Sequence, residues 1–171
     1  MGRPIADWLF ARSTSHGAFE VELVDLREIN LPLFDEPRHP RLRQYAHAHT
    51  KAWSAIVEKA DAFVFVTPEY NHGVPPALVN ALDYLSAEWN YKAAAFVSYG
   101  GPAGGTRSVQ MAKPILLALR MVPIVDAVTI PYFTKLIEGG VFRGGEPHDQ
   151  ASTSMLDELA RWTAALKTLR A

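Results

Sequence analysis

The sequence predicts an α/β protein built on a doubly wound parallel sheet. Apolar runs of strand length alternate with amphipathic segments of helical length, the pattern of βαβ units. One of these runs, residues 62–66, is continuously apolar, as expected for a strand covered on both faces. Right-handed crossovers would place helices on both sides of the sheet, in a three-layer helix–sheet–helix arrangement. With 171 residues and no repeat or long linker, we expect a single domain spanning residues 1–171.

Four segments are expected to form strands. Residues 62–66 form a continuous apolar run, and residues 93–99 and 121–130 are expected to be two further strands. Residues 19–26, "FEVELVDL", instead alternate apolar and acidic side chains at a period of two, which predicts a half-exposed strand.

Five segments are expected to form helices, because apolar residues recur in them at helical spacing and three of them have proline or glycine near their start. Proline-rich residues 30–42 and the stretch 131–150 are expected to be largely loop. The expected helices are residues 4–12, 44–60, 75–89, 106–119 and 154–169.

The composition excludes several classes of protein. A chain with 49% hydrophobic and 20% charged residues is an ordinary globular protein, and a net charge of −1 does not recruit nucleic acid or an anionic membrane. The absence of cysteine excludes disulfides, thiolate metal sites and a cysteine nucleophile. No apolar run approaches the roughly 20 residues that span a bilayer, and no signal-peptide pattern is visible. We therefore expect a cytoplasmic protein with no membrane partner.

A polar loop follows the continuously apolar strand predicted at residues 62–66. Doubly wound sheets bind ligands beyond the carboxyl ends of their strands, which is where "PEYNHG" (68–73) falls. Pro68 fixes its own φ angle, so the backbone N–H groups that follow can face outward along the edge of a flat heteroaromatic ligand. Tyr70 or His72 could cover a ring face, and Asn71 could donate or accept. The alternative is a polar turn that only satisfies its own backbone.

A glycine-rich loop, "SYGGPAGG" (98–105), follows the next strand. Glycine allows positive φ angles and close approach of the backbone to a ligand. The loop matches neither the dinucleotide fingerprint nor a P-loop, and a flexible connection is the alternative. Two such loops after consecutive buried strands favour a binding site.

Other candidates are weaker. His47 and His49 are two positions apart, so on a helix they would point in nearly opposite directions and could not share a metal; with His39 they are expected to form a solvated face. Arg107 is expected to be a surface charge, as is Lys113.

Two further side-chain hypotheses stay open. Asp83 could be a functional carboxylate, although a helix-surface or subunit-contact role is favoured. Ser98 with His72 could suggest a hydrolase, but no G-x-S-x-G elbow is present.

The two loops together resemble a known family. "TPEYNHGVPPALVNALDYL" with "FVSYGGPAGG" is similar to the NADPH-dependent FMN reductase family, whose members are flavodoxin-like flavin, quinone and azo-dye reductases. Val79 departs from the family pattern, which usually has lysine there. The matching positions are Pro68, Glu69, Tyr70, Asn71, Gly73, Pro75, Leu78, Asn80 and Asp83.

The resemblance implies a flavodoxin-like fold that binds FMN and uses NAD(P)H as co-substrate. NAD(P)H would deliver hydride to flavin N5, and a quinone, flavin or similar small acceptor would then take the electrons in a ping-pong sequence, with no catalytic side chain. A homodimer or homotetramer is also implied. The cofactor-binding residues implied are Pro68, Glu69, Tyr70, Asn71, Ser98, Tyr99, Gly100, Gly101 and Arg3.

The start of the chain departs from the family pattern. Family members begin with a buried strand and a loop resembling Gly-Ser-x-Arg-x-x-Arg that holds the FMN phosphate, whereas "MGRPIADWLF" matches only from the end of that loop. Gly2 and Arg3 are at best its remnants. The flavodoxin-like fold would thus be N-terminally truncated, lacking a central strand between 19–26 and 62–66, and we expect a misassigned start codon or a truncated chain. The alternative is a flavin-free or degenerate protein that acts through its oligomer interface.

Overall fold

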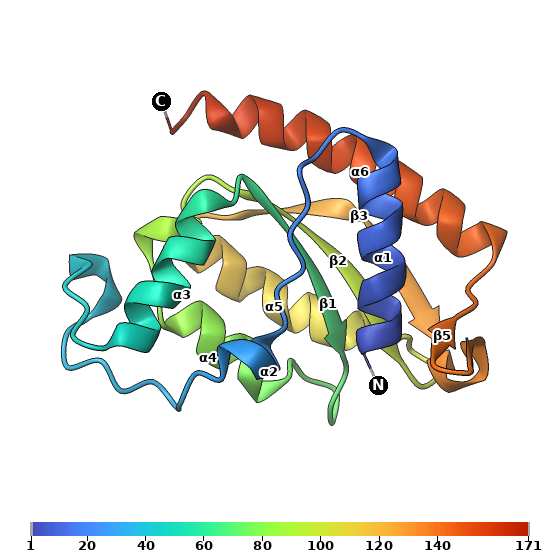
Figure 1. The fold of residues 1–171 in the computed structure, drawn as a ribbon, viewed down its shortest axis with the longest axis horizontal. Coiled ribbons are helices and arrows are strands. Elements are labelled where there is room, and N and C mark those ends of the chain that lie inside the picture. The colour runs from blue at the N-terminus through green and yellow to red at the C-terminus, as the bar shows by residue number, and fades with distance from the viewer. Residues whose placement is uncertain (1, 171) are drawn as a thin grey trace.

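The computed structural model describes residues 2–170. It contains six α-helices, three 3₁₀ turns, a three-stranded sheet and a small hairpin in that range (Figure 1). The elements in chain order are α1 (Arg3–His16), α2 (Leu26–Ile29), η1 (Pro40–Leu42), α3 (Ala48–Lys59), β1 (Ala62–Pro68), α4 (Pro76–Asp83), η2 (Ala87–Trp89), β2 (Ala93–Gly100), α5 (Thr106–Ala118), β3 (Val122–Pro131), η3 (Phe133–Leu136), β4 (Ile137–Glu138), β5 (Val141–Phe142) and α6 (Glu146–Lys167).

The main sheet is parallel, with the order β1-β2-β3. Strand β2 lies in the middle and is buried along nearly its whole length, which explains its continuous apolar sequence. The carboxyl ends of β1 and β2 are in register, with Thr67 opposite Ser98 and Pro68 opposite Tyr99. The register therefore brings the two sequence-predicted loops to one edge of the sheet.

Helices cover both faces of the sheet, so the predicted three-layer α/β architecture is confirmed. Helices α1 and α6 lie together on one face, where Leu9, Val97 and Leu159 belong to a common core. Helices α3, α4 and α5 cover the other face, where a second core contains Trp53 and Phe96.

The predicted strand at 19–26 is wrong. This segment runs extended beside β1 (Figure 1), but it forms no ladder, and the chain enters α2 at Leu26, with the Asp25 carboxylate accepting a hydrogen bond from the N–H of Arg27. A strand needs a hydrogen-bonded neighbour, and β1 is paired only with β2 in the described chain. The alternating pattern thus predicts the extended backbone correctly but not its pairing.

Three other boundaries differ from the sequence prediction. Helix α3 begins at Ala48 rather than at 44, because His47 has extended backbone angles. Helix α4 ends at Asp83, and only the short turn η2 continues toward residue 89. The stretch expected to be loop contains the β4–β5 hairpin and the first turns of α6, which starts at Glu146 with a proline in its first turn.

Candidate functional site

The polar loop after β1 is a tight hairpin. The N–H of Tyr70 donates to the carbonyl of Gly73 (3.2 Å), and the N–H of Gly73 donates back to Tyr70 (2.9 Å). The two residues between Tyr70 and Gly73, Asn71 and His72, have φ angles of 50° and 67°, as in a type I′ turn. The Tyr70 N–H is thus used inside the turn, so the expectation that it faces outward toward a ligand is wrong. The Tyr70 side chain remains 60% exposed at the mouth of the site.

Glu69 ties this hairpin to the start of α5. Its carboxylate accepts hydrogen bonds from Nε (2.6 Å) and from the backbone N–H (3.1 Å) of Arg107, while Arg107 Nη2 lies 2.5 Å away. The Glu69 side chain is only 8% exposed, and the Arg107 contacts hold its pKa below the ordinary value of 4.5. Arg107 is exposed, as expected of a surface charge, but it also pairs with Glu69 and so joins the hairpin to α5. Its position just after the glycine-rich loop was the available signal.

The glycine-rich loop packs closely on the end of β2. Gly105 has a φ of 86°, and a Cβ there would lie 2.8 Å from both the Cβ of Ser98 and the N of Tyr99. Only glycine fits this turn. At Gly101, by contrast, an added Cβ would meet nothing within 4 Å. The loop is therefore rigidly packed at Gly105 and open at Gly101.

Ser98 shapes this loop from inside the protein. It is 1% exposed, and its hydroxyl donates to the carbonyl of Gly104 (2.9 Å). A nucleophile needs access to its substrate, so this arrangement does not favour a Ser98–His72 hydrolase. It also gives Ser98 a supporting role in the loop rather than an open face toward a ligand.

Tyr99 forms the inner wall of the site. Its ring is 7% exposed and packs edge-on against Phe133, with ring centroids 4.9 Å apart. Burial raises the pKa of Tyr99 to about 12, so its hydroxyl stays protonated at physiological pH. Gly2 lies so close to this hydroxyl that a Cβ at position 2 would overlap it. The start of α1 therefore lies beside the carboxyl end of β2.

Arg3, the candidate for phosphate binding, is surrounded by carboxylates. Its Nε donates to Asp7 (2.7 Å), and Nη1 lies 3.8 Å from Asp25 and 3.6 Å from Glu28. Half of its side chain is exposed. The guanidinium is near the site, but its charge is already balanced by three acidic groups.

Asn80 and Asp83 belong to α4, the helix that follows the hairpin in the chain. The Asn80 amide donates to the carbonyl of Pro32 (2.7 Å), and its oxygen accepts from the N–H of Phe34 (3.0 Å), so Asn80 anchors the proline-rich segment to α4. Asp83 is exposed, although partial burial raises the pKa of its carboxyl. Asn80 therefore has a structural role that the sequence analysis did not assign.

The geometry expected for the histidines is wrong. Because His47 precedes α3 with an extended backbone, its ring stacks on that of His49, with centroids 5.1 Å apart. His49 Nε2 lies 3.0 Å from the Asp35 carboxylate, and His47 Nε2 lies 4.0 Å from it. Among residues 2–170, no group of three or more His, Cys, Asp or Glu side chains is arranged to hold a metal.

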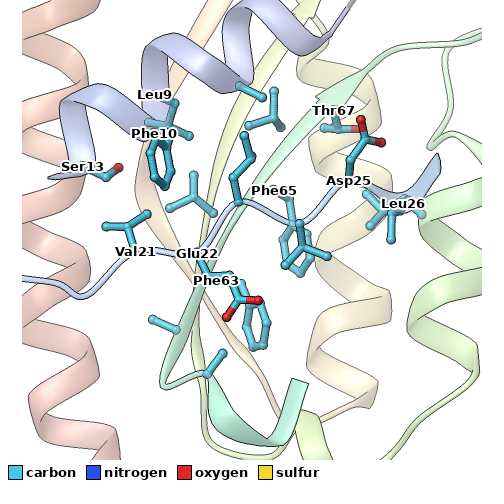
Figure 2. Close-up of a pocket in the computed structure, with 18 of the residues that line it drawn as sticks. Leu9, Phe10, Ser13, Val21, Glu22, Asp25, Leu26, Phe63, Phe65 and Thr67 are labelled. Carbon is cyan, nitrogen blue, oxygen red and sulfur yellow. The ribbon is translucent and has the colours of Figure 1, made fainter. Parts of the chain in front are cut away.

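The residues at the sheet edge fit the ring of a flavin. A single cavity is lined by residues 67–70 of the hairpin and by Tyr99, Gly100 and Gly101 (Figure 2 shows Thr67 and other residues that line it). Open space at Gly101 would admit a planar ring against the backbone, and the exposed Tyr70 lines the same cavity. The fit is weaker at the phosphate end, where Arg3 is already paired. A doubly wound sheet with such a site at its carboxyl edge defines a nucleotide- or flavin-binding α/β protein.

Comparison with known proteins gives the family. The model of the NADPH-dependent FMN reductase family matches residues 1–135. This chain therefore belongs to the NADPH-dependent FMN reductase family of NAD(P)H-dependent flavin and quinone oxidoreductases, with FMN as cofactor, as the two loop motifs suggested.

Similar proteins come from yeasts and bacteria. An NAD(P)H-dependent FMN reductase of Schizosaccharomyces pombe is 41% identical over 140 residues, which cover 80% of this chain and 70% of that protein. One from Saccharomyces cerevisiae is 41% identical over 122 residues, 67% of this chain and 63% of that protein. The structure of FerB, an NAD(P)H:(acceptor) oxidoreductase of Paracoccus denitrificans, superposes with a TM-score of 0.75 at 21% identity, covering 96% of this chain and 90% of FerB. That likeness confirms the fold.

No helix within residues 2–170 combines the length and the apolar character needed to cross a bilayer.

Proposed function

We propose that this chain is an FMN-dependent NAD(P)H oxidoreductase that reduces quinones, flavins or similar small acceptors. The observation that carries the proposal is the register of β1 and β2, which places the Pro68–Asn71 hairpin beside the Tyr99–Gly101 loop at one edge of the sheet. When bound, the flavin would supply the redox chemistry, taking electrons from NAD(P)H and passing them to the acceptor at the same face in a ping-pong sequence.

The role of the protein in this proposal is to bind and orient. Pro68 to Asn71 would hold one edge of the flavin ring, and Gly100 and Gly101 would let the backbone approach its other side. The Glu69–Arg107 pair holds the hairpin at a fixed distance from α5. Backbone N–H groups near the ring would stabilise negative charge on it, so no side chain needs to act as an acid or a base.

The test is reconstitution followed by turnover. The purified protein is incubated with FMN and desalted, and retained flavin is read from its visible absorption; oxidation of NADPH is then followed with and without a quinone. Retained flavin and quinone-dependent NADPH oxidation support the proposal. Parallel lines in double-reciprocal plots support the ping-pong sequence, whereas intersecting lines contradict that part of it.

One observation favours a second candidate, a flavin-free protein that acts through its oligomer interface. Arg3, the residue that the family resemblance implies for phosphate binding, is paired with Asp7, Asp25 and Glu28. A colourless protein that does not retain FMN at any added concentration would favour this candidate. The same preparation tests the homodimer or homotetramer by light scattering, and cell fractionation tests the cytoplasmic location, both of which remain part of the proposal.

A further inference from the structure

Two exposed tyrosines follow the outer strands of the sheet at its carboxyl edge. Tyr70 comes after β1 and is 60% exposed, and Tyr132 comes directly after β3 and is 53% exposed. Because β2 lies between β1 and β3, the glycine-rich loop that follows β2 starts between the two tyrosines. Tyr70 belongs to the hairpin of the candidate flavin site. Tyr132 does not, so its ring is available to a second ligand at the same edge.

The backbone of Tyr132 is tied to the glycine-rich loop. Its N–H donates to the carbonyl of Gly101 (3.1 Å), which continues the pairing of Gly100 with Pro131. Tyr132 also precedes Phe133, and both Gly101 and Phe133 line the cavity of the candidate site. Tyr132 therefore adjoins the open space at Gly101, where the ring of a flavin would lie.

This contact requires an unusual backbone conformation at Tyr132. Its φ and ψ angles are 48° and 38°, in the left-handed region, which a bulky L-residue adopts only at an energetic cost. Asparagine would tolerate the same conformation better. Strained residues of this kind gather at ligand-binding sites. The local backbone thus gives no reason for an exposed tyrosine here, whereas ligand binding does.

Lys135 lies on the same side of the chain as Tyr132. Its N–H donates to the carbonyl of Tyr132 (2.9 Å) at the start of η3, and side chains three positions apart in a 3₁₀ turn lie one above the other. The Lys135 ammonium is accordingly 5.3 Å from the centroid of the Tyr132 ring. A cation over an exposed ring is weakly held, so a bound anion can attract this ammonium.

Lys135 differs in charge balance from the two arginines near the site. Arg107 is paired with Glu69, and Arg3 is paired with three carboxylates. Lys135 is exposed, and no carboxylate of residues 2–170 lies within 4.0 Å of its Nζ. Its positive charge is therefore available to a ligand, next to an aromatic ring that is also exposed.

We propose that Tyr132 and Lys135 determine substrate specificity by recognising an aromatic group that carries a negative charge. The ring packs on Tyr132, and the anion pairs with Lys135. This role rests on the proposed function, because it serves a substrate that meets the flavin ring. The same chemistry has two sources: an acceptor such as a sulfonated or carboxylated quinone, and the phosphate-bearing adenosine of NADPH.

The first test uses the FMN-loaded protein and two quinones of different charge, naphthoquinone sulfonate and neutral menadione. Each variant is compared with the wild type for each quinone separately, so that differences in quinone reactivity cancel. We expect Lys135→Gln to raise KM for the sulfonate about fivefold relative to menadione, as for loss of an exposed ion pair. About 1 M salt should remove this difference from the wild type. Lys135→Arg should behave as the wild type, and Lys51→Gln, at an exposed lysine of α3, is the control.

The aromatic half of the proposal is tested at Tyr132. Tyr132→Asn removes the ring and tolerates the backbone conformation, so we expect it to raise KM for both quinones. Tyr132→Phe keeps the ring and should keep the wild-type KM. An unchanged KM in Tyr132→Asn overturns the role of this ring.

The source of the anion is identified with the two coenzymes. With menadione as acceptor, KM for NADPH is compared with KM for NADH in the wild type and in Lys135→Gln. A rise for NADPH relative to NADH in the variant identifies the adenosine phosphate, whereas a rise confined to the sulfonated quinone identifies the acceptor. If neither anion responds to Lys135→Gln, or if Lys51→Gln has an equal effect, the assignment is overturned.

Direct binding separates this inference from the proposed function. Naphthalene sulfonate, an anionic aromatic compound that is not reduced, is titrated calorimetrically into the wild type and Lys135→Gln, with FMN and without it. Weaker binding by Lys135→Gln supports the assignment even if no quinone is turned over, a result that would contradict only the reductase proposal. Equal affinity of the two proteins for naphthalene sulfonate overturns the pairing of an anion with Lys135.

Discussion

Glu69 and Arg107 join the two loops of the site through a carboxylate that is 8% exposed and a guanidinium Nε 2.6 Å away. Three donors of one residue, including the backbone N–H at the start of α5, converge on this carboxylate. Charge-assisted hydrogen bonds of this kind fix geometry more strongly than neutral ones. The pair therefore sets where the Pro68–Asn71 hairpin stands relative to the sheet, although neither residue reaches across the site.

We expect Arg107→Ala to weaken flavin binding about tenfold, or about 1.4 kcal/mol, because the hairpin loses its anchor. FMN affinity is measured by quenching of flavin fluorescence. The matched control is Arg161→Ala, which removes an exposed arginine that pairs with Glu158 at 2.8 Å on α6, and it should leave affinity unchanged. Equal affinities for the wild type and Arg107→Ala would contradict a positioning role for the pair.

At Asn71 the contribution of the side chain can be tested without changing the backbone conformation. Asn71 has a φ of 50°, which asparagine and glycine tolerate well. Asn71→Gly therefore keeps the turn and removes only the amide. We expect Asn71→Gly and Tyr70→Ala each to weaken FMN binding several-fold with an unchanged circular dichroism spectrum. Retention of wild-type affinity in both variants would show that these side chains do not contact the flavin.

Two glycines of the second loop should respond in opposite ways. Gly105→Ala puts a Cβ 2.8 Å from Ser98 at a positive φ, so we expect it to lower the free energy of unfolding by about 1–3 kcal/mol. Gly101→Ala puts its Cβ into open space, so stability should be unchanged while FMN affinity falls because the methyl group occupies space of the ring. Urea unfolding and FMN titration of both variants check this. A Gly101→Ala variant with full affinity would place the ring elsewhere.

The burial of Lys92 predicts that the stability of the protein depends on pH. This effect does not involve the candidate flavin site. It is 4% exposed, and its ammonium donates to the carbonyls of Val57 (2.7 Å) and Glu58 (3.1 Å) at the end of α3. Burial lowers the pKa of Lys92 from 10.5 to about 8. Below pH 8 the native state carries the full cost of a buried charge, whereas between about pH 8 and 10.5 the unfolded state binds more protons, so this group makes the protein more stable as pH rises.

Urea unfolding from pH 7 to pH 10 tests this sign. The contribution of Lys92 to the free energy of unfolding should increase by up to about 3 kcal/mol over this range, and Lys92→Met should flatten the curve. Lys51→Met, a change at an exposed lysine of α3, is the control and should keep the wild-type slope. Parallel curves for wild type and Lys92→Met would contradict the buried charge. The comparison with Lys92→Met cancels the contribution of the tyrosines, which are about half ionised in the unfolded state at pH 10.

The sequence predicts local structure well where a segment depends on its own residues. The run that became β2 is recognisable because this strand is buried along nearly its whole length, and the runs that became β1 and β3 are recognisable because they are largely apolar. The two loops of the site could be found for the same reason, since they follow these runs directly. Proline at the second position of α6 was a usable signal for its start at Glu146, and it was missed.

Sequence reasoning fails where structure depends on a distant partner. Residues 19–26 have the period of a strand, yet a strand is defined by its neighbour, and in the described chain β1 is paired only with β2. The pairing of Glu69 with Arg107, 38 positions apart, likewise follows from the register of two strands rather than from either local sequence. His47 illustrates a smaller case, in which one extended residue before a helix brings two histidine rings together.

The most direct test of the flavin site is amide hydrogen exchange of the wild-type chain with and without saturating FMN. Simultaneous slowing in residues 68–73 and 99–105, with little change in α6, is the predicted result. Slowing in only one of these loops, or in neither, would contradict the claim that the hairpin after β1 and the glycine-rich loop after β2 hold the same planar ring.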